Sequence, residues 1–117
     1  MKSGDEIAPL TPAVFHILLA LAHGEKHGYE IMKQVRQDTN GKVKMGNGTL
    51  YGSIKRMLND QLIAAAGDRV DPELDDERRR YYRLTEAGRR ALQAEMRRYV
   101  ETVALLQRRD LLGERSR

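Results

Sequence analysis

The stretch Asn47-Gly-Thr-Leu-Tyr-Gly-Ser-Ile-Lys-Arg-Met-Leu-Asn59 decides the fold of this 117-residue chain. Its large apolar side chains follow the i, i+4, i+7, i+8 spacing of a helix with one buried stripe, and they are Leu50, Ile54, Met57 and Leu58. The opposite side carries small, polar and basic residues. We therefore predict a helix from about 47–49 to about 60 whose outer side is free to meet a partner.

Two further helices are predicted before this stretch. Thr11 is placed to cap the first helix, and Pro12 suits the first helical position because its missing N–H loses nothing there. A wide apolar face follows, formed by Val14, Phe15, Ile17, Leu18 and Leu21. The second helix is expected over about 28–38, and the breaker sequence at 39–41 ends it.

A hairpin and a long helix are predicted after it. Segments 62–66 and 80–84 have strand character, and the charged, turn-rich segment 67–77 between them indicates a long tip. Tyr82 and Leu84 share one strand face, which we expect to pack on the core. Thr85 is placed to cap the last helix. The expected class is mainly α with a small β-hairpin.

The order helix, helix, helix, hairpin is that of a winged helix-turn-helix, in which the third helix enters the DNA major groove. On the outer side of this helix, Lys55 can contact a base edge or a phosphate, and Tyr51 and Ser53 can donate to phosphates. The alternative interpretation is an ordinary solvated helix face.

Three motifs in register carry a family resemblance. They are His27-Gly28-Tyr29-Glu30-Ile31, the run Gly48-Thr49-Leu50-Tyr51 with Ile54 to Leu58 and Leu62-Ile63, and the stretch from Tyr81 to Gly88. Together they resemble the PadR family of transcriptional regulators over residues 10 to about 106. Two positions depart from the family pattern. Gly52 stands where the family usually has proline, and Gln61 stands where it usually has glycine.

The resemblance implies a sequence-specific DNA-binding regulator. We expect a repressor that binds double-stranded DNA as a homodimer at a near-palindromic operator. We expect contacts to DNA from eleven side chains, namely Tyr29, Lys33, Asn47, Thr49, Tyr51, Ser53, Lys55, Arg56, Arg78, Arg79 and Arg80. Tyr29 is equally compatible with a role as core filler. The expected units are a flexible segment 1–9, a winged helix-turn-helix domain 10–85, a dimerisation helix 86–112 and a tail 113–117.

The wing is open to two interpretations. Its three consecutive arginines at 78–80 can hold phosphates beside the groove, as the resemblance implies for basic wing residues. The tip, however, carries acidic side chains that DNA would repel, at Asp71, Glu73, Asp75, Asp76 and Glu77. A charged and solvated loop is the competing interpretation, and a winged-helix module for protein–protein contact without DNA binding is the competing function.

The last helix carries a heptad seam with steps of 4, 3, 4 and 3, formed by Leu92, Met96, Tyr99, Val103 and Leu106. A second copy of the chain would cover this seam, with Val14 or Ile17 of the first helix joining the interface; the alternative is that the helix folds back on its own domain. PadR proteins are similar, and this chain resembles the shorter subfamily with a single C-terminal helix. Some relatives respond to small aromatic molecules, which implies an effector site near Phe15, Met96 and Tyr99.

The composition narrows the function classes. The formal net charge is +4 and the isoelectric point is about 9.6, which favours a polyanionic partner. With no cysteine, disulfides, thiolate metal sites and a cysteine nucleophile are excluded. No phosphate-binding glycine loop or His–carboxylate pairing indicates an enzyme, and His16, His23 and His27 are not spaced as metal ligands. We expect no metal, no cofactor, no membrane segment and a cytoplasmic location.

Overall fold

The computed structural model describes residues 9–70 and 78–112, which form four helices and three strands. In chain order these are α1 (Pro12–Leu21), β1 (Lys26–His27), α2 (Gly28–Thr39), α3 (Asn47–Asn59), β2 (Ile63–Val70), β3 (Arg78–Leu84) and α4 (Glu86–Arg108). The predicted order of three helices, a hairpin and a long helix is confirmed. The predicted flexible segment 1–9 and tail 113–117 lie outside the described residues, Pro9 excepted.

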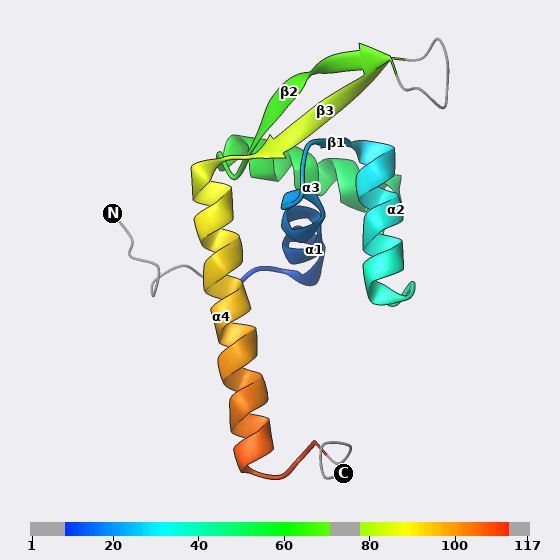
Figure 1. The fold of residues 1–117 in the computed structure, drawn as a ribbon. Helices are drawn as coiled ribbons and strands as arrows, with labels where there is room; N and C mark the ends of the chain where they lie inside the picture. The colour runs from blue at the N-terminus through cyan, green and yellow to red at the C-terminus, as the bar shows by residue number, and fades with distance from the viewer. Residues whose placement is uncertain (1–8, 71–77, 113–117) are drawn as a thin grey trace.

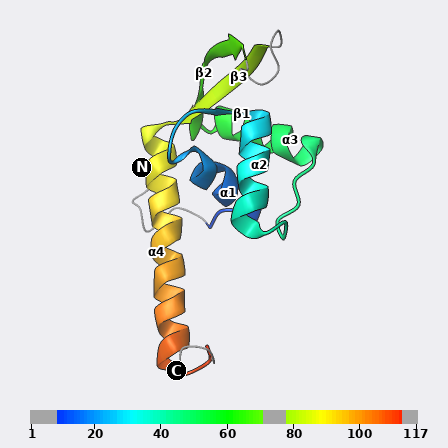
Figure 2. The same ribbon diagram turned by 45° about the vertical axis from the view of Figure 1, so that its right-hand side comes forward.

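Helix α1 lies at the centre of the domain, with α2 on one side and α4 on the other (Figure 1). Turning the molecule brings α2 forward and shows α3 beside it, below the hairpin (Figure 2). The buried core draws on every helix and on the sheet, and it includes Ile17, Leu18, Ile31, Val35, Leu50, Ile54, Met57, Ile63 and Leu84. The apolar stripe predicted for α3 therefore packs in the core and attaches this helix to the rest of the domain.

The three strands form one antiparallel sheet in the order β1-β3-β2. Strand β1 is two residues long and pairs Lys26 with Tyr82, and the sequence analysis did not predict it. The hairpin strands are longer than the predicted 62–66 and 80–84. Gly67, with φ +96°, lies at the irregularity in pairing between Ala65 and Asp68, which lets β2 continue to Val70.

The helix ends follow local rules. Thr11 accepts a hydrogen bond from the N–H of Val14, and Thr85 accepts one from the N–H of Gly88, so both predicted caps are confirmed. At the end of α3, Gln61 has φ +63°, and the N–H of Leu62 donates to the carbonyl of Met57. This left-handed ending is usually made with glycine, and it strains Gln61, whose Cβ disfavours a positive φ.

Helix α4 has 23 residues, a length of about 35 Å, and only its first half is anchored. Its buried residues end at Glu95, whereas Met96, Tyr99, Val100 and Val103 are exposed. The second half extends beyond the other elements (Figure 1). The radius of gyration of 16.3 Å exceeds the ~13 Å of a compact chain of this length, as a projecting helix requires.

Three residues expected at the dimer interface, Val14, Ile17 and Leu92, belong to the chain's own core, and the last two are buried almost completely. Ile17 is 0% exposed and Leu92 is 3% exposed, and both pack in the hydrophobic core. Neither has surface left for a partner, so the first residue of the seam belongs to the domain itself.

The predicted packing of one face of strand β3 on the core is confirmed, because Tyr82 and Leu84 are buried. Tyr81, on the other face of the strand, is buried as well.

The start of α4 packs directly on the turn between α3 and β2 through Gly88. A Cβ at Gly88 would lie 2.0 Å from the carbonyl oxygen of Leu62, far inside van der Waals contact. The same carbonyl accepts the N–H of Thr85 at 3.1 Å, and the hydroxyl of Thr85 donates to the carbonyl of Gln61 at 2.6 Å. Only a residue without a side chain allows this backbone contact.

We predict that Gly88→Ala destabilises the fold, because the new methyl group forces two backbone segments apart. The free energy of unfolding should fall by about 1–3 kcal/mol or more, as for overpacked sites. Gly52→Ala is the matched control, since among the described residues nothing lies within 4 Å of its Cβ, and it should stabilise the helix by about 1 kcal/mol. Urea denaturation of both variants checks this; equal stabilities would contradict the contact.

Candidate nucleic-acid interface

The outer side of α3 presents polar and basic side chains to solvent. Tyr51, Lys55 and Arg56 are exposed, as are Asn47 and Thr49 at the start of the helix, and Ser53 is half-buried. Tyr51 and Lys55 are one turn apart and therefore lie on the same side. Because the opposite stripe is buried, the helix cannot rotate, and its orientation relative to the domain is fixed.

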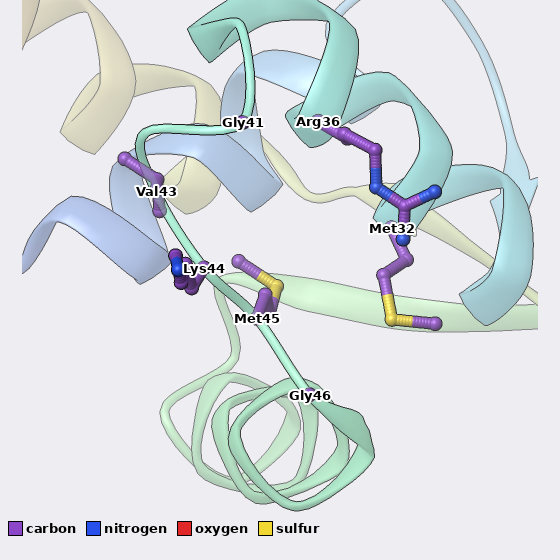
Figure 3. A pocket seen from close by; sticks show the side chains of 7 residues that line it. All are labelled: Met32, Arg36, Gly41, Val43, Lys44, Met45 and Gly46. Carbon is purple, nitrogen blue, oxygen red and sulfur yellow. The ribbon is translucent and has the colours of Figure 1, made fainter.

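The turn between α2 and α3 contains a hollow of about 310 Å³. Figure 3 shows its lining, with Met32 and Arg36 from α2 facing the segment that carries Val43, Lys44 and Met45. Gly46 precedes the first turn of α3 and has no side chain with which to cap it. Exposed Arg36 and Lys44 place two more cations beside this end of the helix, and the sequence analysis did not identify them.

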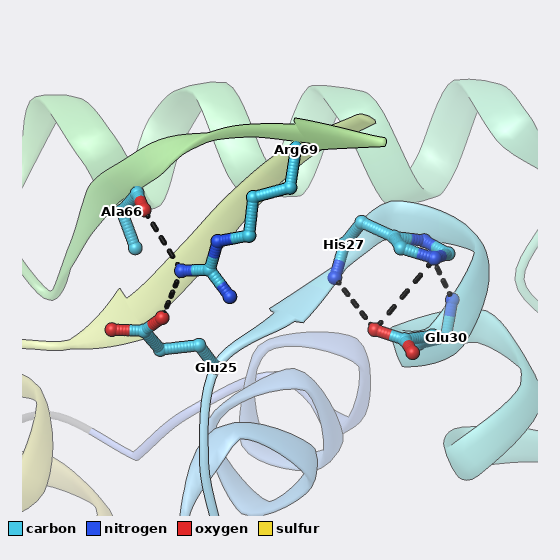
Figure 4. Close-up of polar contacts among 5 residues, drawn as sticks. All are labelled: Glu25, His27, Glu30, Ala66 and Arg69. Atoms are coloured by element: carbon cyan, nitrogen blue, oxygen red, sulfur yellow. Dashed lines mark hydrogen bonds and ion pairs between the residues drawn. The ribbon is translucent and has the colours of Figure 1, made fainter. Parts of the chain in front are cut away.

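The start of α2 is built around the buried His27. Its Nδ1 accepts a hydrogen bond from the N–H of Glu30 at 3.3 Å, and the Glu30 carboxylate accepts one from the N–H of His27 at 3.1 Å, as Figure 4 shows. These reciprocal bonds form a capping box. The His27 ring packs edge-on against Tyr81 with centroids 5.2 Å apart, which connects α2 to the sheet.

Tyr29 and Lys33 form the exposed side of α2. Tyr29 is exposed rather than filling the core, which decides between its two predicted placements. The Nζ of Lys33 lies 5.6 Å from the centroid of the Tyr29 ring, within the range of a cation–π interaction. The pair thus holds a positive charge at the surface of the second helix.

The predicted wing arginines differ in their surroundings. Arg80 is exposed, and its Nε lies 3.4 Å from the Oδ1 of Asp68 on the neighbouring strand. Arg79 is half-buried. The side chain of Arg78 and the acidic residues 71–77 lie outside the described part of the chain. Asp68 therefore partly neutralises the most exposed of the described wing arginines.

Arg69 is a fourth wing arginine, and the sequence analysis did not single it out. It extends from β2 toward the segment before β1, where it pairs with Glu25 and donates to the carbonyl of Ala66 at 3.0 Å (Figure 4). Its guanidinium carbon lies 4.1 Å from the centroid of the Tyr81 ring. Arg69 thus ties the wing to the domain, and no local sequence signal marks such a nonlocal contact.

Tyr82 lies on the other face of the sheet, toward α3. Burial raises the pKa of Tyr82 above its ordinary value, Arg80 lowers it, and Tyr51 and Asp68 raise it. These electrostatic interactions place the Tyr51 phenol, the wing base and Tyr82 in one neighbourhood. The Tyr51 side of α3 and the described base of the wing therefore approach each other at Tyr82.

The residues that the structure describes form neither a metal site nor a membrane span. Within 9–70 and 78–112, no three His, Cys, Asp or Glu side chains cluster as a metal ion would need. Over these residues, no helix is both long enough and apolar enough to cross a membrane.

Comparisons with known proteins agree with this geometry. The model of the "Transcriptional regulator PadR-like family" matches residues 17–94. The chain is 27% identical over 90 residues to protein X of Lysinibacillus sphaericus, covering 77% of this chain and 80% of that protein. Its structure is similar to that of a PadR family transcription regulator from Clostridium difficile R20291, with 27% identity, a TM-score of 0.70, and coverage of 84% of this chain and 97% of that one.

A further similar structure is that of Bacillus subtilis PadR in complex with operator DNA. The TM-score is 0.58 at 20% identity, and the match covers 68% of this chain and 44% of that chain. This chain therefore corresponds to less than half of that protein's length.

Proposed function

The chain belongs to the PadR-like family of transcriptional regulators, and we propose that it is a repressor that binds double-stranded DNA as a homodimer. In this proposal α3 lies in the major groove and the wing contacts the neighbouring backbone. The operator is near-palindromic because two identical subunits read two half-sites. The observation that supports the proposal is the outer side of α3, which exposes Tyr51, Lys55 and Arg56. The buried stripe on the opposite side of the helix fixes the orientation of these side chains.

Each of these side chains suits a different kind of contact. Lys55 lies in the middle of the helix and is our candidate for a base edge, since lysine can bind the acceptors of guanine. Arg56, and Lys33 on α2, suit backbone phosphates. Tyr51 lies one turn before Lys55, where its hydroxyl can donate to a phosphate and fix the register. Asn47, Thr49, Ser53, Tyr29 and the wing arginines 78–80 complete the proposed contact surface.

The proposed dimer uses the projecting half of α4. Met96, Tyr99 and Val103 are between 44% and 49% exposed and follow the 3, 4 spacing of a helix seam. Val100 is 68% exposed beside them, and Leu106 continues the seam half-buried. A second copy would remove this apolar surface from water. Val14, although largely buried, stays in the proposal as the contribution of α1.

A protein–protein module without DNA binding is the second candidate. The observation that favours it is the pairing of Arg80 with Asp68, which reduces the positive charge that the wing can offer to phosphates. The two functions differ in their dependence on salt, because neutralising phosphates releases counterions and makes DNA affinity fall steeply as salt rises.

We predict distinct effects for two substitutions on α3, measured with a duplex selected from a random pool by the wild-type protein. Lys55→Ala should weaken binding to that duplex by ~1–3 kcal/mol and relax preference at one base position. Arg56→Ala should weaken all duplexes alike and reduce the salt slope by about one unit. Fluorescence anisotropy at several salt concentrations measures both effects.

Ile54→Ala is the control for these substitutions, because Ile54 is buried and its loss should lower stability by roughly 2–5 kcal/mol rather than change contacts to DNA. If Tyr51→Ala and Lys55→Ala both leave affinity unchanged in folded, dimeric protein, α3 is not the reading element. The protein-interaction candidate is then the better account.

We predict that Val103→Glu converts the dimer to monomer. The substitution would place a charge inside the proposed seam, at a free-energy cost of several kcal/mol. Sedimentation velocity at micromolar concentration measures the change. Thr102→Glu adds the same charge at an exposed position beside the seam, and it should remain dimeric. A dimeric Val103→Glu protein would exclude this helix as the interface.

A small aromatic effector is a further part of the proposal. The expected site near Phe15, Met96 and Tyr99 is supported by one observation. Met96 lines a hollow of about 540 Å³ on α4. Phe15 and Tyr99 do not line this hollow, and their rings pack against each other with centroids 5.0 Å apart. We predict that a planar aromatic compound or a phenolic acid raises the melting temperature by mass action. A thermal-shift screen of both classes without a single stabiliser would contradict it.

A further inference from the structure

Gly28 is the first residue of α2 and is buried. Its backbone has no positive φ, so the conformation itself does not require glycine. A neighbouring side chain fills the space instead: a Cβ at Gly28 would lie 2.4 Å from the Oη of Tyr51, 2.9 Å from its Cζ and 3.1 Å from its Cε1, so the phenol would have to shift. The space in which a side chain would begin is thus occupied by the Tyr51 phenol.

Other elements of the structure also surround the Tyr51 ring. Leu50 and Ile54 on either side of Tyr51 along α3 are buried, so the helix that carries the ring cannot move away. Tyr82 lies close enough for the Tyr51 phenol to contribute to its raised pKa, a shift caused chiefly by burial. The ring therefore lies between the start of α2, helix α3 and strand β3. With 46% of Tyr51 exposed, part of it remains open to solvent.

We infer that Gly28 is a positioning residue for DNA binding, and that it acts by seating the Tyr51 phenol. This inference rests on the proposed function, in which the Tyr51 hydroxyl contacts a phosphate. A phenol held in place before binding loses less conformational freedom when DNA arrives, which favours affinity. A side chain at position 28 would displace the hydroxyl without removing any group that itself contacts DNA.

The test is a double-mutant cycle of Gly28→Ala and Tyr51→Ala, with affinity measured on the duplex that the wild-type protein selects from a random pool. Tyr51→Ala should weaken binding roughly tenfold, as for loss of one hydrogen bond to a charged group. Gly28→Ala should weaken it by a similar factor, about tenfold at most. The double variant should bind no more weakly than Tyr51→Ala alone, because nothing remains for position 28 to seat.

Thermal unfolding of the same four proteins is the second readout. Gly28→Ala should lower the melting temperature by no more than roughly 4 °C, because the half-exposed Tyr51 phenol can shift toward solvent, and it should not lower it in the Tyr51→Ala background. Gly52→Ala, whose Cβ meets nothing within 4 Å among the described residues, should not lower it. If Gly28→Ala does not fold, the double variant must fold as Tyr51→Ala does, and a double variant that is also unfolded overturns the inference.

Two results contradict this inference while leaving the proposed function intact. One is wild-type affinity in Gly28→Ala when Tyr51→Ala is weak, and the other is losses that multiply in the double variant. The proposed function itself fails if the wild-type protein selects no duplex and shows no salt-dependent binding, or if Tyr51→Ala and Lys55→Ala both leave affinity unchanged. The two failures are therefore separable.

Discussion

The backbone contact between α4 and the turn that follows α3 determines how the long helix is joined to the rest of the molecule. At this junction Gly88 approaches the Leu62 carbonyl so closely that no side chain fits, and Thr85 bonds to the carbonyls of Leu62 and Gln61. Backbone-to-backbone contacts of this kind leave less freedom than side-chain packing, because no rotamer can adjust to absorb a displacement. The angle at which α4 leaves the turn after α3 is therefore fixed by the chain itself.

This fixed angle connects the two halves of the proposed function. If two copies pair through α4, the distance between their α3 helices follows from the junction rather than from a flexible linker. DNA offers successive major grooves about 34–36 Å apart, so a dimer with loosely held reading helices would lose affinity to the ordering that binding requires. The capping box at His27 and the pairing of Arg69 with Glu25 hold α2 and the wing to the same frame.

Much of this arrangement follows from local sequence signals. Thr11, Pro12 and Thr85 mark helix starts because capping depends on neighbouring residues alone, and the period of Leu50, Ile54 and Met57 identifies the buried side of α3. The exposed side chains of the candidate site follow from the same period. Those predictions needed no knowledge of the tertiary structure.

The remaining features depend on contacts between distant segments. Strand β1 has two residues and exists only because β3 lies beside it. The heptad spacing of α4 predicted an apolar stripe, but it could not show whether each position packs on the chain's own domain or on a second copy. Leu92 packs in the domain core. No sequence pattern identified Arg69 or Arg36. Arg69 matters because it pairs with Glu25, which is distant in the sequence, and Arg36 because it lines the hollow beside α3. Local periodicity carries no such information.

The central claim is that α3 and the base of the wing form the DNA-binding surface. Amide chemical-shift mapping of the isotope-labelled protein with its selected duplex tests this most directly, because it reports on every described element at once. The account predicts changes concentrated in α3, in the first turn of α2 and at the paired ends of β2 and β3, with the second half of α4 unaffected. Chemical-shift changes confined to the exposed half of α4, with none in α3, would contradict this claim.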